Sequence, residues 1–120
     1  MAGKLFARAH ALTDYGQIPG KDWLVIQATN AGMHPHVEEA PIEDMEFYKH
    51  VEIGYDLIFN PGVTRFMKLA ESCGGRAYNG ARMLVYQGII AFELWTGTSI
   101  DQGTADELCQ KMAYALTQQE

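Results

Sequence analysis

The side chains best suited to bind a metal occur together in one short stretch of the sequence. His34 and His36 are followed closely by Glu38 and Glu39, and imidazole and carboxylate groups are both metal ligands. The stretch is polar, however, and its spacing fits no zinc signature. We therefore interpret these residues as a solvated loop and predict no metal site.

Three other residues have chemistry that suits a small-molecule site. The Gln87 amide can both donate and accept hydrogen bonds. Asp56 is the only acid within a predicted apolar strand. Gly80 lacks the Cβ that would keep a ligand away from its backbone. Each residue also has an ordinary explanation. Gln87 is then a solvated helix glutamine, Asp56 is a carboxylate that holds nearby backbone, and Gly80 forms a turn between strand and helix. The residues alone leave both explanations open.

The elements that must position these residues alternate between strands and helices. The apolar run 23–29 does not alternate with polar residues, which predicts a strand buried on both faces. Residues 55–60 predict a second buried strand, and residues 76–79 predict a third, short strand. The alternation indicates an α/β fold, namely a partial Rossmann-like (doubly wound) domain with a short parallel sheet of about three strands flanked by helices.

Four helices are predicted from apolar residues at helical spacing and from residues suited to cap them. Thr64 is the expected N-cap of the second helix, and Thr104 is the expected cap of the fourth. The first three predicted ranges are 3–12, 65–72 and 81–95, and the fourth helix is predicted to follow Thr104 and to run through Leu108, Met112 and Leu116. Between the first two strands, residues 30–41 are rich in turn formers, so they predict a loop at the strand's C-terminal end, where open α/β sheets bind ligands.

Composition narrows the class of protein. A length of 120 residues predicts a single domain over residues 1–120. The formal net charge is −6 and the nine lysines and arginines are scattered, which argues against nucleic-acid binding. The longest apolar stretch, 89–95, is too short to span a membrane. The beginning of the chain has no signal-peptide pattern, and the two cysteines have no metal-ligand spacing. These features predict a cytoplasmic protein.

Three blocks of sequence occur in a distinctive order. They are IQATNAGMHPHVEEAPI at 26–42, YDLIFNPGVTRFMKLAESCGG at 55–75 and NGARMLVYQGIIAFELWTG at 79–97. The first is similar to a strand end with Asn-Ala-Thr, then Gly-Met and a proline-bearing loop. The second is similar to Tyr-Asp-x-x-Tyr-x-Pro-x-x-Thr, and the third to Asp-Gly-x-x-Met-Leu-x-x-Gln. In this order and spacing the chain resembles the shikimate dehydrogenase family over roughly residues 2–110.

The resemblance implies an NADP-dependent oxidoreductase that reversibly reduces 3-dehydroshikimate to shikimate, a step of aromatic amino-acid (chorismate) biosynthesis. In that family a substrate domain with the catalytic lysine and aspartate comes first, and a glycine-rich phosphate loop follows it. This sequence contains no GxGxxG motif. We therefore expect the chain to be the C-terminal portion of the cofactor-binding domain, to carry no catalytic residue, and to be inactive by itself.

The resemblance also implies roles for particular residues. The cofactor contacts that it implies are Thr29, Leu57, Gly80 and Met83, of which Met83 would pack near the nicotinamide ring. As alternatives, Thr29 is an ordinary strand-end hydroxyl and Met83 an ordinary core methionine.

Two residues are implied to contact the substrate. Gln87 corresponds to a glutamine that hydrogen-bonds a substrate hydroxyl. Phe59 stands where the family has a tyrosine, so it can pack against the substrate but cannot donate a hydrogen bond. A further departure is Gln27, which stands where the family usually has asparagine. The phenylalanine at position 59 is therefore also compatible with a substrate that differs from the family's usual one.

Two other functions remain open. The chain is alternatively a non-catalytic structural or regulatory module of a multifunctional or quinate-pathway protein, or a quinate/shikimate dehydrogenase relative that uses NAD. A sheet with only part of its strands leaves an exposed edge and uncovered apolar helix faces. We therefore expect the chain to associate with itself, and we expect no membrane or nucleic-acid partner.

Overall fold

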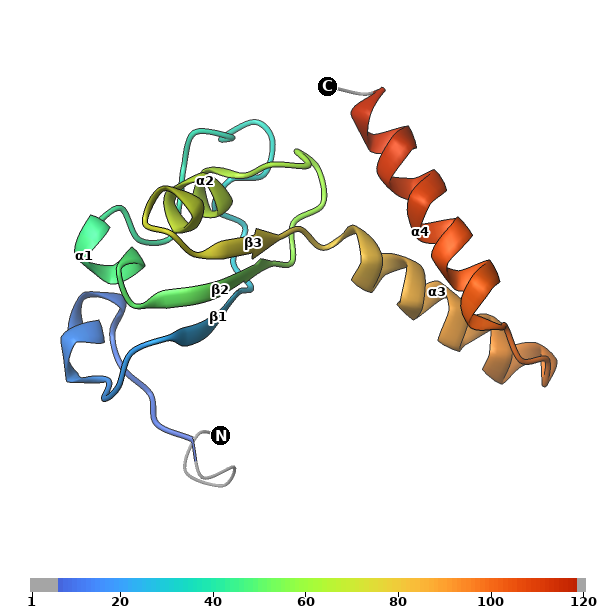
Figure 1. Ribbon diagram of the computed structural model, residues 1–120, viewed down its shortest axis with the longest axis horizontal. Helices are drawn as coiled ribbons and strands as arrows, with labels where there is room; N and C mark the ends of the chain where they lie inside the picture. The colour runs from blue at the N-terminus through green and yellow to red at the C-terminus, as the bar shows by residue number, and fades with distance from the viewer. Residues whose placement is uncertain (1–6, 119–120) are drawn as a thin grey trace.

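The computed structural model describes residues 7–118 and has a three-stranded sheet at its centre (Figure 1). The strands are β1 (Trp23–Gln27), β2 (Val51–Asp56) and β3 (Arg76–Tyr78), in the order β1-β2-β3. Both neighbouring pairs are parallel. This arrangement confirms the predicted α/β fold with a short parallel sheet.

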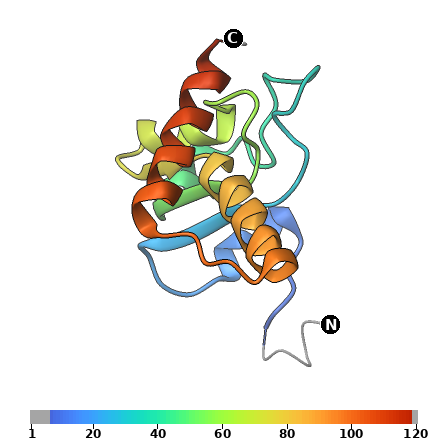
Figure 2. The same cartoon turned by 90° about the vertical axis from the view of Figure 1, so that its right-hand side faces the viewer.

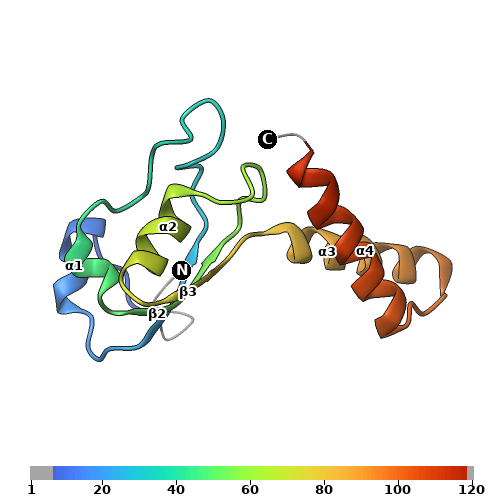
Figure 3. The same ribbon diagram turned by 45° about the horizontal axis from the view of Figure 1, so that its top comes forward.

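Helices α1 (Met45–Tyr48) and α2 (Arg65–Ser72) lie on one face of the sheet and form the core with it (Figure 3). Gly54 in β2 allows α2 to come close, because a Cβ at this position would lie 3.1 Å from the Phe66 ring. The core consists of apolar side chains from both helices and β2, namely Phe47, Tyr48, Val51, Phe66, Met67 and Ala70.

Helices α3 (Ala81–Thr96) and α4 (Gln102–Thr117) form a hairpin that projects away from the sheet (Figures 1 and 2). Gly97 ends α3 with a left-handed conformation, φ 70°, which glycine adopts without a steric penalty. Among the described elements, α3 and α4 pack extensively only on each other. None of the described helices is long and apolar enough to cross a membrane.

The strand predictions were correct in number and wrong in detail. β1 is not buried on both faces, because Leu24 and Ile26 are 65% and 60% exposed on the face opposite α1 and α2, and no described helix covers that face. β2 begins at Val51 and ends at Asp56, so the predicted strand 55–60 was displaced toward the C-terminus. The third strand lies where it was expected.

Two helix predictions were also wrong. Residues 7–11 have no helical structure, and a 3₁₀ helix spans Leu12–Gln17; the rest of the predicted helix 3–12 lies outside the described residues. Residues 7–11 are all exposed, and a short helix without packing is marginal in water. The last helix begins at Gln102 because Asp101 is its N-cap, where Oδ1 accepts the Thr104 N–H at 2.7 Å.

The other local predictions are confirmed. Thr64 caps α2, where its side chain accepts the Met67 N–H, and the helix covers the predicted residues. Residues 30–41 contain no helix or strand. The α3 helix begins at Ala81 as predicted and extends one residue further.

Candidate functional site

The C-terminal ends of the three strands lie side by side at one edge of the sheet. Gln27 at the end of β1 is paired with Asp56 at the end of β2, and Tyr55 is paired with Tyr78 at the end of β3. Because the strands are parallel, the segments that follow them also leave at this edge. The predicted residues Thr29, Leu57, Phe59 and Gly80 belong to these segments.

A buried carboxylate ties these segments together. Asp56 is fully buried, and its Oδ2 accepts the Thr64 hydroxyl at 2.6 Å. Its Oδ1 accepts the Ile58 N–H at 2.9 Å. The Gln27 amide Nε2 lies 3.3 Å from the same Oδ1. One side chain therefore fixes the end of β2, the start of α2 and the end of β1, which is the backbone role that the sequence suggested for it.

The environment of Asp56 also sets its protonation. Burial raises the pKa of this carboxyl above its ordinary value of 3.8. The hydrogen bonds from Thr64, Ile58 and Gln27 oppose the shift, because they stabilise the charged form. Burial has the larger effect, so folding disfavours the ionised carboxylate.

Gln27 extends the network to Thr29. The Gln27 Oε1 accepts the Thr29 hydroxyl at 2.7 Å and the Thr29 backbone N–H. The Gln27 Nε2 donates to the Ala31 carbonyl at 3.1 Å. The Thr29 hydroxyl is thus engaged with the protein, although the residue itself is exposed. Thr29 is positioned at the sheet edge by Gln27, the residue that departs from the usual asparagine.

Gly80 is required by a close approach of two backbone segments. A Cβ on Gly80 would lie 2.1 Å from the Leu57 carbonyl oxygen and 3.1 Å from the Leu57 Cα. The Gly80 N–H also donates to the Ile58 carbonyl at 3.0 Å. The absent Cβ accommodates Leu57, which supports the turn explanation and places Gly80 against the predicted cofactor residue Leu57.

Helix α3 starts at this point and carries the other two predicted residues. Met83 lies in the first turn of the helix and is half-buried, and Gln87 lies about one turn further along and is exposed. Phe59, in the segment after β2, is 36% exposed. The sheet edge therefore gathers Thr29, Leu57, Phe59 and Gly80, while Met83 and Gln87 follow on helix α3, which begins at this edge.

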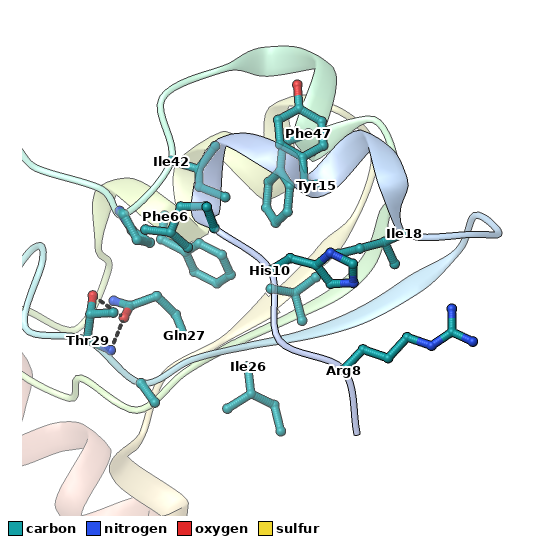
Figure 4. A pocket seen from close by; sticks show the side chains of 15 residues that line it. Arg8, His10, Tyr15, Ile18, Ile26, Gln27, Thr29, Ile42, Phe47 and Phe66 are labelled. Atoms are coloured by element: carbon teal, nitrogen blue, oxygen red, sulfur yellow. Dashed lines mark hydrogen bonds between the residues drawn. The ribbon is translucent and has the colours of Figure 1, made fainter. Parts of the chain in front are cut away.

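A pocket of about 310 Å³ lies beside β1, whose outer edge pairs with no strand of residues 7–118 (Figure 4). Gln27 and Thr29 line one end of the pocket, and Arg8 and His10 lie on the segment that runs past it. Its walls are mainly apolar, with Val25, Ile42, Phe47 and Phe66 among them. The other predicted site residues do not line this pocket.

The histidine-bearing loop gives a metal no enclosed site. Ligand atoms of His36, Glu38 and Glu39 lie within 4.8 Å of one another, and all three residues are exposed. The His36 ring lies 3.7 Å from the Glu39 carboxylate. Exposed acidic groups of this kind often cluster without an ion. The geometry adds nothing in favour of a metal centre.

Sequence reasoning missed how the site is held together. The hydrogen bond between Asp56 and Gln27 joins residues that are far apart in the sequence. The hydrogen bond between Asp56 and Thr64 crosses the loop that separates β2 from α2. The available signal was an acid in an apolar strand followed by a threonine at a helix start. Arg8 and His10, which line the pocket beside β1, were not predicted as site residues, because the sequence pattern predicted that they belong to a helix.

The family model and the curated relatives described below are those of shikimate dehydrogenases. A family model described as "Shikimate 5'-dehydrogenase C-terminal domain" matches residues 80–106. The NADP(+) shikimate dehydrogenase of Desulforamulus reducens is 46% identical over 74 residues, which is 62% of this chain and 25% of that enzyme. The chain spans about a quarter of the length of the curated relatives it matches.

Solved structures agree in fold. A chorismate mutase/shikimate 5-dehydrogenase fusion protein from Clostridium acetobutylicum superposes with a TM-score of 0.80 at 32% identity, over 88% of this chain and 39% of that one. The Thermus thermophilus shikimate 5-dehydrogenase in complex with NADP(H) and shikimate has a TM-score of 0.62 at 30% identity, over 74% and 33%. The 5-ketofructose reductase of a Gluconobacter species has a TM-score of 0.59 at 34% identity, over 79% and 34%.

Proposed function

This chain belongs to the shikimate dehydrogenase family and matches the C-terminal part of its members. From that premise we propose that it forms the side of a shikimate dehydrogenase site that contacts the nicotinamide and closes over the substrate. The complete enzyme reversibly reduces 3-dehydroshikimate to shikimate with NADPH. The observation that carries this proposal is the gathering of Thr29, Leu57, Phe59 and Gly80 at the C-terminal edge of the parallel sheet, where open α/β sheets bind their ligands.

The residues of this chain fit one end of the cofactor. Leu57, which lies against Gly80, and Met83, in the first turn of α3, are half-buried apolar side chains, and such side chains suit the flat nicotinamide ring. The sequence holds no GxGxxG motif for the pyrophosphate. When bound, the cofactor supplies the hydride. The role of Leu57 and Met83 is to orient the ring and to exclude water from it.

Gln87 and Phe59 contact the substrate in this proposal. The Gln87 amide is exposed and can donate to one hydroxyl while it accepts from another. Phe59 contributes an apolar surface at the mouth of the site. The proton that accompanies hydride transfer is handled by the lysine and aspartate of the family's substrate domain, and the resemblance assigns neither role to a residue of this chain. We therefore propose that the 120 residues are inactive by themselves.

A chimera tests the role of Gln87. The part of the Desulforamulus reducens enzyme that precedes the matched segment is joined to this chain, and NADPH oxidation is followed with 3-dehydroshikimate. We expect Gln87→Ala to lower kcat/KM by about a hundredfold, because it removes hydrogen bonds to a substrate hydroxyl in an otherwise complete site. Gln110→Ala, an exposed helix glutamine on α4, is the matched control and should leave kcat/KM unchanged. Equal effects of the two substitutions would contradict the assignment.

A second candidate is a dehydrogenase of the same family with a different hydroxylated substrate. Phe59 favours it, because the family's tyrosine hydroxyl is absent from the position that is expected to face the substrate. The similarity to a 5-ketofructose reductase also favours it, since that protein is named for another carbonyl substrate. The chimera separates the two candidates: rapid reduction of 5-ketofructose with slow reduction of 3-dehydroshikimate supports the second.

A further inference from the structure

The buried amide of Gln27 uses all of its hydrogen-bonding groups within the protein. The residue lies at the end of β1 and is 3% exposed. Its Nε2 donates to the Ala31 carbonyl at 3.1 Å and lies 3.3 Å from the Asp56 Oδ1. Its Oε1 accepts both the backbone N–H and the hydroxyl of Thr29. A side-chain amide has two donor hydrogens and two acceptor lone pairs, so these contacts use each of them once.

Two backbone groups determine which way this amide points. The Thr29 N–H can only donate and the Ala31 carbonyl can only accept. In the reversed orientation the Gln27 nitrogen would face the N–H and its oxygen would face the carbonyl. Both hydrogen bonds of a buried side chain would then be lost, which is costly. The Gln27 oxygen therefore faces Thr29, and the Thr29 hydroxyl must donate its hydrogen to that oxygen.

The Thr29 hydroxyl consequently has one function left for a ligand. Its hydrogen is donated to the Gln27 Oε1 at 2.7 Å. One of its lone pairs accepts the Ala31 N–H at 3.2 Å. Because a hydroxyl has one hydrogen and two acceptor lone pairs, these two bonds leave one lone pair. The hydroxyl can therefore accept a hydrogen bond from a ligand, but it has no hydrogen to donate to one.

Thr29 is exposed, whereas the side chain that orients it is buried. Thr29 lies in the segment after β1 and lines one end of the pocket beside that strand (Figure 4). Gln27 is in turn held by Asp56 of β2, whose Oδ2 accepts the Thr64 hydroxyl. A supporting network of this kind keeps a contact group in one geometry before a ligand arrives. Thr29 thus presents a fixed acceptor at the edge of the sheet where the strands end.

We propose that Gln27 is a positioning residue, which makes the Thr29 hydroxyl an acceptor for a hydrogen-bond donor at the nicotinamide end of the cofactor. The inference rests on the proposed function, because it takes Thr29 as a cofactor contact. Two kinds of group at that end can donate, the carboxamide N–H and the ribose hydroxyls, whereas the oxygens of an ionised pyrophosphate only accept. Thr29 therefore favours the nicotinamide end over the phosphates, since two acceptors placed side by side are unfavourable.

Hydrogen exchange in the 120-residue chain tests the positioning by itself. Gln27→Met keeps the length of the side chain and removes both polar atoms, so the Thr29 N–H loses its acceptor. We expect exchange of the Thr29 amide to accelerate at least about tenfold more than that of the Met67 amide, which bonds to Thr64. Equal acceleration of the two amides would mean a general loosening of the fold and would overturn the positioning role.

Cofactor binding tests the direction of the hydrogen bond in the chimera with the preceding part of the Desulforamulus reducens enzyme. Thr29→Val removes the hydroxyl at nearly constant shape and should raise the dissociation constant of NADPH about tenfold. Thr29→Ser keeps the hydroxyl, and Thr98→Val changes an exposed threonine between α3 and α4, so each should raise that constant by less than about twofold. Thr29→Val should leave the affinity for 2′,5′-ADP unchanged, because that probe carries phosphates and no nicotinamide.

A reduced acetylpyridine analogue of NADPH identifies the donor, because it has an acetyl group in place of the carboxamide and so lacks the N–H. A Thr29→Val effect below about twofold with this analogue assigns the carboxamide, and an effect of about tenfold assigns a ribose hydroxyl. Gln27→Met should weaken NADPH binding about tenfold in the wild-type background and less than about twofold beside Thr29→Val, because Gln27 acts through Thr29.

The results separate this inference from the proposed function. A folded chimera that binds no NADPH contradicts both. A chimera that binds and oxidises NADPH, and whose affinity Thr29→Val does not change, overturns the inference alone. So does a Thr29→Val variant that weakens 2′,5′-ADP binding as much as NADPH binding, since the hydroxyl would then contact a phosphate. Circular dichroism checks that each variant is folded.

Discussion

The buried hydroxyl of Thr64 allows the site's supporting network to be tested by a nearly isosteric change. Thr64→Val keeps the shape of the side chain and removes the hydroxyl, which donates to Asp56 at 2.6 Å and accepts the Met67 N–H at 3.3 Å. Loss of the helix cap costs about 1 kcal/mol. Loss of the hydrogen bond to a buried carboxylate costs about 2 kcal/mol more. We therefore expect the free energy of unfolding to fall by about 3 kcal/mol.

Thr64→Ser is the control, because it keeps the hydroxyl and removes one methyl group, at a cost of about 1 kcal/mol. Urea denaturation followed by circular dichroism measures both changes. If the free energy of unfolding falls by about 1.5 kcal/mol per M urea, a loss of about 3 kcal/mol lowers the urea concentration at half-unfolding by roughly 2 M. In an Asp56→Asn background the difference between valine and serine should shrink, because the hydrogen bond then involves no charge. Equal costs for Thr64→Val and Thr64→Ser in the wild-type background would refute the reasoning.

The same pair of variants has a defined pH dependence. Burial raises the pKa of Asp56 in the folded state above 3.8, so the unfolded state loses its proton first as the pH rises. The contribution of Asp56 to stability therefore falls between the unfolded and the folded pKa. The Thr64 hydroxyl favours the ionised form, and its removal raises the folded pKa further. The cost of Thr64→Val should consequently be larger near neutral pH than at about pH 3, where the carboxyl is protonated in both states.

Other substitutions test separate parts of the account. Gly80→Ala should lower the free energy of unfolding by about 3 kcal/mol, because its Cβ would lie 2.1 Å from the Leu57 carbonyl oxygen. Gly88→Ala on α3 should raise the free energy of unfolding by about 1 kcal/mol, because a Cβ there meets nothing within 4 Å. Urea denaturation measures both changes. Arg82→Ala should change stability by less than about 1 kcal/mol in the same assay, since its ion pair with Asp106 is exposed, and a larger loss would indicate that the pair anchors the hairpin. Phe59→Tyr in the chimera should lower KM for 3-dehydroshikimate by up to about tenfold through a new hydrogen bond; an unchanged KM would show that Phe59 does not face the substrate.

Local signals in the sequence predicted the elements that depend on local interactions. The α2 helix was predicted with its cap because a capping threonine and its N–H partner lie within one turn. The end of α3 followed from Gly97 in the same way. The start of α4 was misplaced because Asp101 and Thr104 are both good capping residues, and only Asp101 accepts the hydrogen bond. Helix α1 was not foreseen, because its four residues are held by packing of Phe47 and Tyr48 in the core.

Burial and long-range contacts were the features that the sequence did not reveal. The run containing Leu24 and Ile26 has the composition of a fully buried strand, yet those side chains face outward because no described element packs on that side of the sheet. The parallel order of the strands could be predicted, and with it the common edge that holds Thr29, Leu57 and Gly80. The contact between Gly80 and Leu57 could not, because it depends on how closely two loops approach each other.

The central claim is that this chain carries one side of a dehydrogenase site which another polypeptide segment must complete. The most direct measurement compares NADPH oxidation in the presence of 3-dehydroshikimate by the 120-residue chain and by the chimera with the preceding part of the Desulforamulus reducens enzyme. We predict no turnover by the chain alone and turnover by the chimera. Robust turnover by the isolated chain, or a folded chimera that binds NADPH and remains inactive with every carbonyl substrate tested, would contradict it.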